Sequence, residues 1–142
     1  MVNNNAVNAY IDTDVIIRLL TGDDEQKRND TTALFEKVSN GKLVLTTPDT
    51  AIADAVFVLS SSNLYHLHRT EIRDLLVPLL SYPNFKIENK QIVIQALDYY
   101  ADKNIDFGDA MLVALTEQSE EKTIYSYDHD FDKFPDIIRK EP

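Results

Sequence analysis

The sequence predicts an α/β fold of three layers (α/β/α) with a mainly parallel central sheet. Short segments rich in β-branched and aromatic residues alternate with longer segments of helical pattern, and this alternation favours parallel strands joined by crossover helices. With 142 residues, 44% of them hydrophobic, the chain can bury one full core. We therefore expect a single domain over residues 1–142, in which residues 1–8 form a flexible polar tail.

Four short apolar segments are expected to form the strands. They are residues 9–11, 43–46, 85–87 and 123–127. In open α/β sheets, functional groups gather beyond the carboxyl ends of the strands. Asp12 and Asp128 directly follow the first and the last of these segments, so both are candidates for a functional site.

The helices are expected from the spacing of apolar residues and from capping signals. They cover residues 15–20, 23–39, 49–60, 70–80, 90–103 and 107–118. Thr47 is the expected N-cap of the third helix, with Pro48 in its first turn. Pro78 is expected to kink or shorten the fourth helix, and Asp106 to cap the sixth.

The charge and composition exclude several classes of protein. The formal net charge of −10 disfavours general DNA-binding modules, because it repels a phosphate backbone. The absence of Cys rules out disulfides and thiolate metal sites. No apolar run approaches the ~18 residues of a membrane span, and residues 1–8 lack the Lys and Arg of a signal peptide. We therefore expect a cytoplasmic protein with no membrane partner.

Asp54 is the only charged residue in the expected helix over residues 49–60 beyond its first turn. A helix that is apolar almost all round is expected to be buried. Because an unpaired buried carboxylate is costly, Asp54 is expected to face a cation, a set of donors or water in a cleft. The alternative is that Asp54 lies on an exposed stripe of the helix.

Asp106 and Asp109 lie three residues apart at the expected start of the last helix. Helix capping alone explains both, since Asp106 suits the N-cap and Asp109 the first turn. The apolar run that follows, Met111 to Leu115, predicts a buried helix. Asp109 is then expected at the mouth of the core, as Asp54 is.

Acidic residues therefore come from four separate regions of the chain. Asp14 follows Asp12 after the first strand, and Asp130 follows Asp128 after the last. Turn chemistry explains each pair alone, but a divalent cation explains the convergence of so many like charges. Ligand sets of oxygen alone favour Mg²⁺ or Mn²⁺, and three scattered His residues disfavour a zinc site.

Two segments resemble motifs of a known family, each with one departure. Asp12-Thr13-Asp14 resembles a motif in which an acid after the first strand is followed by Thr-Asn, and here Asp14 replaces the Asn. Asp54 resembles a Glu within an apolar helix. The shorter Asp side chain is expected to weaken activity, because Mg²⁺ tolerates little error around its ~2 Å ligand distance.

Two further segments complete the resemblance. Asp109-Ala110 resembles a motif with an acid before Ala at a helix start. Residues 126–131 resemble a motif in which Thr or Ser stands two residues before an Asp and a Phe follows. The family with these motifs is the PIN domains, and the greatest resemblance is to the VapC-type toxins of prokaryotic toxin–antitoxin pairs. It covers nearly the whole chain.

The resemblance implies a metal-dependent endoribonuclease that cleaves single-stranded RNA with Mg²⁺ or Mn²⁺. It implies catalytic and metal-binding roles for four residues: Asp12, Asp54, Asp109 and Asp128. Accessory roles fall to Thr13, Asp14, Asp106, Ser126 and Asp130. Arg18 and Lys133 are expected either to contact neighbouring phosphates or to be plain surface cations. The implied partners are RNA, a cognate antitoxin and a second copy of the chain in a homodimer.

Two alternative functions remain open at this point. A PIN-fold module that binds a partner without robust nuclease activity is compatible with Asp54 in place of Glu. A haloacid-dehalogenase-like phosphatase is compatible with Asp12 and Asp14, which resemble its nucleophile and acid pair. The sequence disfavours the phosphatase, because no Gly-Asp-x-x-x-Asp segment and no clear catalytic Lys follow.

Overall fold

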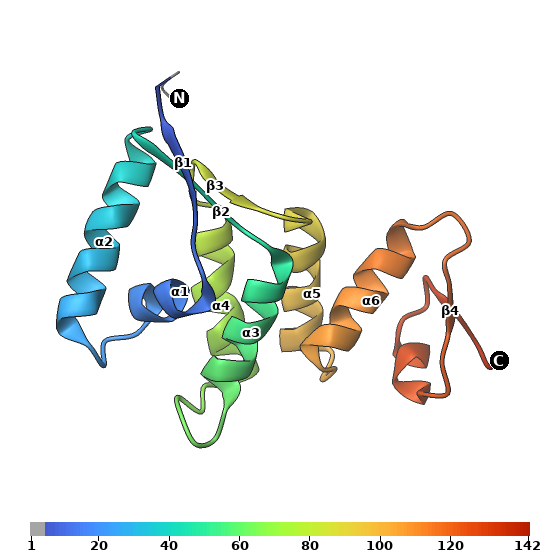
Figure 1. Ribbon diagram of the computed structural model, residues 1–142. Helices are drawn as coiled ribbons and strands as arrows, with labels where there is room; N and C mark the ends of the chain where they lie inside the picture. Colours follow the sequence, from blue (N-terminus) through green and yellow to red (C-terminus); the bar gives the residue numbers. More distant parts are fainter. Residues whose placement is uncertain (1–4) are drawn as a thin grey trace. The chain divides into compact units, whose positions relative to one another are not determined.

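The computed structural model describes residues 5–142, which form two compact units (Figure 1). One unit ends at Lys90 and the other begins at Gln91. The first contains β1 (Val7–Tyr10), α1 (Thr13–Leu20), α2 (Glu25–Ser39), β2 (Leu43–Thr47), α3 (Asp49–Ser60), α4 (Arg69–Leu80) and β3 (Phe85–Ile87). The second contains α5 (Lys90–Asp102) beyond its first residue, α6 (Phe107–Gln118), β4 (Thr123–Tyr125), the 3₁₀ helix η1 (His129–Lys133) and β5 (Ile138–Lys140).

The first unit is built on a parallel sheet with the strand order β1-β2-β3. Val7 is in register with Leu43, and Leu45 with Phe85. Helix α2 packs along β2, α4 contacts β3, and α1 packs against α2 and α3. The carboxyl ends of β1 and β2 lead directly into α1 and α3 (Figure 1). The predicted α/β fold with a parallel sheet flanked by helices is confirmed.

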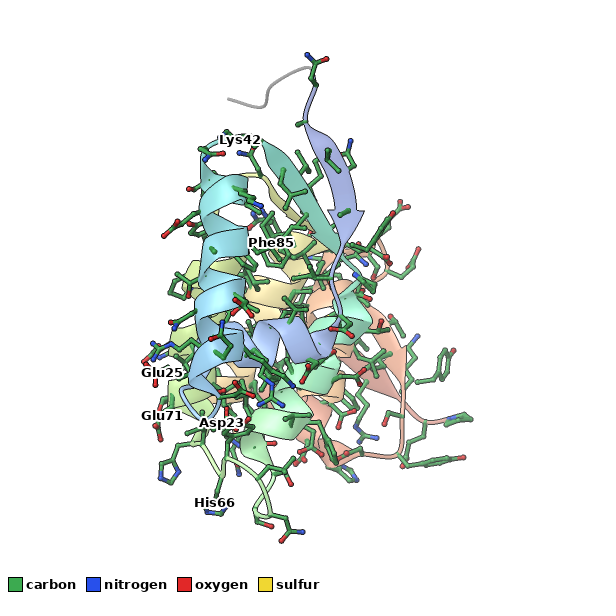
Figure 2. The ribbon with its side chains drawn as sticks, turned by 60° about the vertical axis from the view of Figure 1, so that its left-hand side comes forward. Asp23, Glu25, Lys42, His66, Glu71 and Phe85 are labelled. Carbon is green, nitrogen blue, oxygen red and sulfur yellow. The ribbon has the colours of Figure 1, made fainter. Side chains whose placement is uncertain are left out.

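The core of the first unit lies between the sheet and its helices. Phe85 of β3 is 1% exposed, and its ring meets that of Phe35 of α2 edge to face, with centroids 5.5 Å apart. Figure 2 shows Phe85 in the interior, while Lys42 lies at one end of the unit and Asp23 at the other. Burial of each such side chain stabilises the folded state by about 1.5–3 kcal/mol, so this packing holds the sheet against α2.

The second unit pairs two short parallel strands with two helices. Thr123 of β4 is in register with Ile138 of β5, and Tyr125 with Lys140. Helices α5 and α6 and the 3₁₀ helix η1 each bury side chains, and the ring of Tyr100 of α5 meets that of Phe107 of α6 edge to face, with centroids 6.3 Å apart. Neither η1 nor β5 was predicted. β5 carries charges at two of its three positions and therefore has no apolar pattern that indicates a strand.

Two strand boundaries differ from the prediction. β1 begins at Val7 rather than at residue 9, so the last two residues of the tail expected over residues 1–8, Val7 and Asn8, pair with β2. The first four residues of that tail lie outside the described residues. β4 ends at Tyr125 rather than at residue 127, and the backbone bends at Tyr127. Ser126 Oγ accepts a hydrogen bond from the Asp128 N–H across this bend, at 2.9 Å.

The predicted caps also need correction. Pro48, not Thr47, is the N-cap of α3. Thr47 is buried at the end of β2, and its Oγ1 donates a hydrogen bond to the Ile11 carbonyl at 2.9 Å, which joins the ends of β1 and β2. Helix α4 is not shortened at Pro78 and continues to Leu80. Its buried apolar face offsets the backbone hydrogen bond that the proline ring removes.

Candidate functional site

Asp12 occupies the turn that joins β1 to α1. It is the N-cap of α1, and its Oδ1 accepts a hydrogen bond from the Val15 N–H at 3.1 Å. The positive end of the helix dipole favours a carboxylate at this position. The structure therefore places Asp12, exposed, beyond the carboxyl end of β1, where the sequence predicts it.

Asp14 and Asp54 line one cavity of about 420 Å³ in the first unit. Thr13, Arg18 and Tyr65 also line this cavity. Thr13 Oγ1 donates a hydrogen bond to the carbonyl of Ala51 at 3.0 Å, which ties α1 to α3. The Thr between the two acids thus has a structural role, because it holds together the two helices that carry Asp14 and Asp54.

The apolar composition of helix α3 suggested that it is buried on all sides, but the structure shows that it is not. One face is buried, whereas Asp54 is exposed and Phe57, one turn further on, is 73% exposed. The exposed stripe of α3 thus includes a large apolar side chain, that of Phe57, which is why composition alone overestimated the burial of this helix. Asp54 lies on this stripe and faces the cavity.

Arg18 is held between two carboxylates. Its Nε lies 3.4 Å from Asp14 Oδ1, and its Nη1 lies 3.4 Å from Asp23 Oδ1. Asp23 also accepts hydrogen bonds from Thr21 Oγ1 at 2.9 Å and from Tyr65 Oη at 2.6 Å. The hydrogen bond from Tyr65, then that from Thr21, lowers the pKa of Asp23. Arg18 is thus already paired and oriented along one side of the cavity.

Sequence reasoning missed Asp23 and Tyr65. The two residues are 42 positions apart, and no motif connects them. Asp23 lies at one end of the first unit, near Glu71 and His66 (Figure 2). The only sequence signal was the surplus of Asp over Glu, which indicates that many Asp side chains have specific partners.

The second unit gathers four acidic residues around the start of α6. Asp109 lies in the first turn of α6, and Asp106 is the N-cap residue, although its side chain makes no capping hydrogen bond. Burial first, then the charges of Asp128, Asp106 and Asp130, raise the pKa of Asp109. The structure therefore brings these predicted site residues within electrostatic range of one another.

The segment that carries Asp128 is fixed by its own polar groups. Asp128 caps η1, and its Oδ1 accepts a hydrogen bond from the Asp130 N–H at 2.9 Å. Ser126 Oγ in turn accepts from the Asp128 N–H at 2.9 Å. Each of these two side chains satisfies a backbone donor, so the conformation from Ser126 to Asp130 is locally determined.

Arg139 of β5 is a further support that sequence reasoning missed. Its side chain is 12% exposed. Its Nη1 donates to the Ser126 carbonyl at 3.0 Å, its Nε donates to Asp132 Oδ1 at 3.0 Å, and its Nη2 lies 3.0 Å from His129 Nδ1. The hydrogen bond from Arg139, and after it that from His129, lowers the pKa of Asp132. One guanidinium thus joins β5 to both sides of the Asp128 segment.

Lys133, a predicted phosphate contact, has partners within its own unit. Its Nζ lies 3.5 Å from Asp130 Oδ1 and donates to the Asn104 carbonyl at 3.4 Å. These contacts place its positive charge beside the acidic group around Asp109 and Asp128.

Comparison with known families identifies the fold of this chain. The family model for the PIN domain matches residues 9–137. The chain belongs to the PIN domain family. The match includes parts of both units and all four of the predicted catalytic acids. No curated protein matches the chain.

PIN domains are generally nucleases, which are hydrolases, and they generally use divalent metals. The acids of this PIN domain offer carboxylate oxygens, the donors that Mg²⁺ and Mn²⁺ prefer. Within residues 5–142, no group of three or more His, Asp or Glu side chains is already arranged to hold a metal ion. Asp12 and Asp54 lie in the first unit, and Asp109 and Asp128 in the second. The donor chemistry fits a hard cation. Over the same residues, no helix is both long and apolar enough to span a membrane.

Proposed function

We propose that this PIN domain is a Mg²⁺- or Mn²⁺-dependent endoribonuclease that cleaves single-stranded RNA. The observation that supports this proposal best is the group of acids around Asp109. Burial first, and then the charges of Asp128, Asp106 and Asp130, raise the pKa of Asp109, so the ionised carboxylate is destabilised at this point of the folded protein. A bound cation would remove that destabilisation, and strained electrostatics of this kind are typical of functional sites.

The proposed metal ligands are Asp109 and Asp128 of the second unit with Asp12 and Asp54 of the first. When bound, a divalent ion would activate water and neutralise charge on the phosphodiester. Asp12 and Asp128 each use one carboxylate oxygen to accept a backbone N–H, which orients the other oxygen.

The remaining predicted residues have supporting roles in this proposal. Thr13 ties α1 to α3, and Ser126 fixes the turn before Asp128. Asp14, Asp106 and Asp130 add negative charge that strengthens cation binding. Arg18 and Lys133 are the proposed phosphate contacts, and both are already oriented by carboxylates.

We further propose that the chain acts in the cytoplasm as the toxin of a toxin–antitoxin pair and forms a homodimer. An unrestrained ribonuclease harms its host, so a small antitoxin is expected to cover the acidic site. Such an inhibitor would present Arg or Lys to the carboxylates, since opposite charges fix the register of an interface. A small gene beside this one, and slowed growth when the chain is expressed alone, are the expected observations.

RNA cleavage by the purified chain tests the proposed activity. Single-stranded RNA is incubated with the wild type in Mg²⁺, in Mn²⁺ and in a chelator, and cleavage is expected only with metal. Asp109→Asn and Asp128→Asn are expected to remove it. Asp136→Asn is the matched control, because Asp136 is an exposed acid of the same unit outside the Asp109 group. Cleavage that persists in both site variants contradicts the proposal.

A binding module without robust nuclease activity is the second candidate, and Asp54 favours it. The position carries Asp where the resemblance implies Glu, which shortens the reach toward a metal by one methylene. If neither the wild type nor Asp54→Glu cleaves RNA, while the chain captures its neighbouring gene product, this second candidate replaces the first.

A further inference from the structure

The two-stranded sheet of the second unit presents an exposed face that the proposed chemistry does not use. Thr123 is in register with Ile138, and Tyr125 with Lys140. Because side chains alternate along a strand, these four residues share one face, and Arg139 points to the other. Tyr125 is 66% exposed and Ile138 is 53% exposed. None of the four carries a negative charge.

This face continues directly toward the candidate site. Tyr127 is 69% exposed and immediately precedes Asp128. The segment between Tyr125 and Asp128 is held by Arg139, which donates to the Ser126 carbonyl at 3.0 Å. The two exposed rings therefore extend from a fixed backbone rather than from a free loop, and they lie within three residues of a proposed metal ligand.

The net charge of −10 makes such a face useful to a ribonuclease. Phosphate contacts supply most of the affinity of ordinary nucleic-acid-binding proteins, and this chain has few cations to offer. Stacking of bases on aromatic side chains is the other general source of affinity for single strands, and it does not depend on net charge. An acidic protein that binds RNA is expected to rely on it.

We propose that Tyr125, Tyr127 and Lys140 form an RNA-binding face, on which the two rings stack with bases that flank the cleaved bond. Lys140, the register partner of Tyr125, contacts the phosphate between them. This proposal rests on the proposed ribonuclease function and names where the substrate lies beside Asp128.

The composition of the face favours RNA over a second copy of the chain. A stable protein interface buries about 800 Å² on each partner and has an apolar centre. Here Ile138 is the only aliphatic residue among the four that share the face, and a lysine lies beside the exposed Tyr125. Exposed aromatic rings beside a cation are instead features of single-strand-binding surfaces, where bases stack on the rings and the cation contacts the backbone.

Equilibrium binding of a fluorescent single-stranded oligoadenylate of about ten nucleotides tests the proposal, since single-strand sites span about 4–16 nucleotides. Anisotropy is measured in the Asp109→Asn background to prevent cleavage, and kcat and KM are measured in the otherwise wild-type chain. Tyr125→Leu and Tyr127→Leu are each expected to weaken binding by about five- to one-hundred-fold. Tyr→Phe at the same positions keeps the ring and is the matched control, expected to bind nearly as wild type.

Salt dependence separates the two kinds of contact. Lys140→Gln is expected to reduce the slope of log K against log salt by about 0.7, the value for one phosphate contact on a single strand. The Tyr→Leu variants are expected to leave this slope unchanged. Tyr125, Tyr127 and Lys140 are exposed, so each of these substitutions is expected to leave the thermal melting of its parent chain unchanged and to show that the variant folds.

The possible outcomes distinguish failure of the proposed RNA-binding face from failure of the proposed ribonuclease activity. If the wild type cleaves RNA but the Tyr→Leu variants keep its KM and affinity, the face is refuted and the ribonuclease stands. If the wild type never cleaves but binds RNA through both rings, the face stands and the ribonuclease fails. If the Tyr→Leu variants change only the oligomeric state in sedimentation, the face is a contact between copies and the proposal is wrong.

Discussion

Replacement of Asp109 by Asn is expected to stabilise the metal-free protein while it removes the response to metal. Burial and the neighbouring charges of Asp128, Asp106 and Asp130 raise the pKa of Asp109 from its ordinary value of 3.8. A raised acid pKa means that folding favours the protonated form. The stability that this group contributes is therefore present below about pH 3.8 and is lost as pH rises through the raised pKa.

The size of the effect follows from the three neighbouring charges. Charge pairs near a protein surface are worth about 0.2–1 kcal/mol each, so three repulsions amount to about 0.6–3 kcal/mol, with a middle value of about 2 kcal/mol. Asp109 also gains about 0.3–1 kcal/mol from the N-terminal dipole of α6, which Asn forfeits. The net gain is then about 1 kcal/mol, which raises Tm by about 3 °C in a chain of this size.

Thermal melting at pH 7, with a chelator and with Mg²⁺, measures both parts of this prediction. A metal that binds only the folded state at ten times its Kd stabilises the wild type by about 1.4 kcal/mol, or about 4 °C. Asp109→Asn is expected to melt about 3 °C above the wild type without metal and to show no shift with it. At pH 3 the difference between the two metal-free proteins is expected to disappear.

The choice of control depends on the structure. Asp132 is unsuitable, because its hydrogen bonds to Arg139 and His129 support the Asp128 segment. Asp136→Asn serves instead and is expected to leave the metal response intact. A lower metal-free Tm for Asp109→Asn, or a metal response equal to that of the wild type, would refute the electrostatic reasoning.

Three further predictions follow from individual contacts. Asp14→Asn removes the ion pair to Arg18 at 3.4 Å and a negative charge that would repel the phosphates of the proposed substrate, so RNA cleavage is expected to be retained or improved; its loss in a cleavage assay contradicts the accessory role of Asp14. Asp54→Glu is expected to raise cleavage several-fold without changing Tm, since the cavity of about 420 Å³ admits one more methylene; an equal rate shows that the short side chain does not limit the site. Burial and the hydrogen bond to Glu117 raise the pKa of Tyr99 to about 12, so stability is expected to be lost as pH rises from about 10 to 12. In ultraviolet titration Tyr99→Phe is expected to remove the latest tyrosine ionisation, and an unchanged titration contradicts this assignment.

The sequence alone was sufficient for local features. Strand and helix positions depend on apolar spacing and on neighbouring caps, and all four strands and six helices predicted are present, with some ends shifted. The position of Asp12 after β1 and of Asp109 in the first turn of α6 also follow from neighbours a few residues away. These features can be predicted from the sequence because local backbone preferences determine them.

The misplaced features share one physical cause. Thr47 suits an N-cap by its sequence, but a hydrogen bond to Ile11, 36 residues away, holds it in β2 instead. Asp54 was expected in a buried helix, because the composition of α3 is apolar. Composition does not show which faces of a helix the neighbouring elements cover. In both cases the outcome depends on parts of the chain that are distant in sequence, which a local pattern does not contain.

Only the tertiary structure revealed the partners that orient the candidate site. Arg18 is paired with Asp23, which Tyr65 holds from a loop 42 residues further along the chain. The guanidinium of Arg139 fixes the segment before Asp128, and the register of β5 places Lys140 beside Tyr125. A sequence determines which carboxylates follow strands, since that is a property of adjacent residues. Which distant side chains neutralise or support them depends on packing, because their energies are realised only after the chain has closed its long loops.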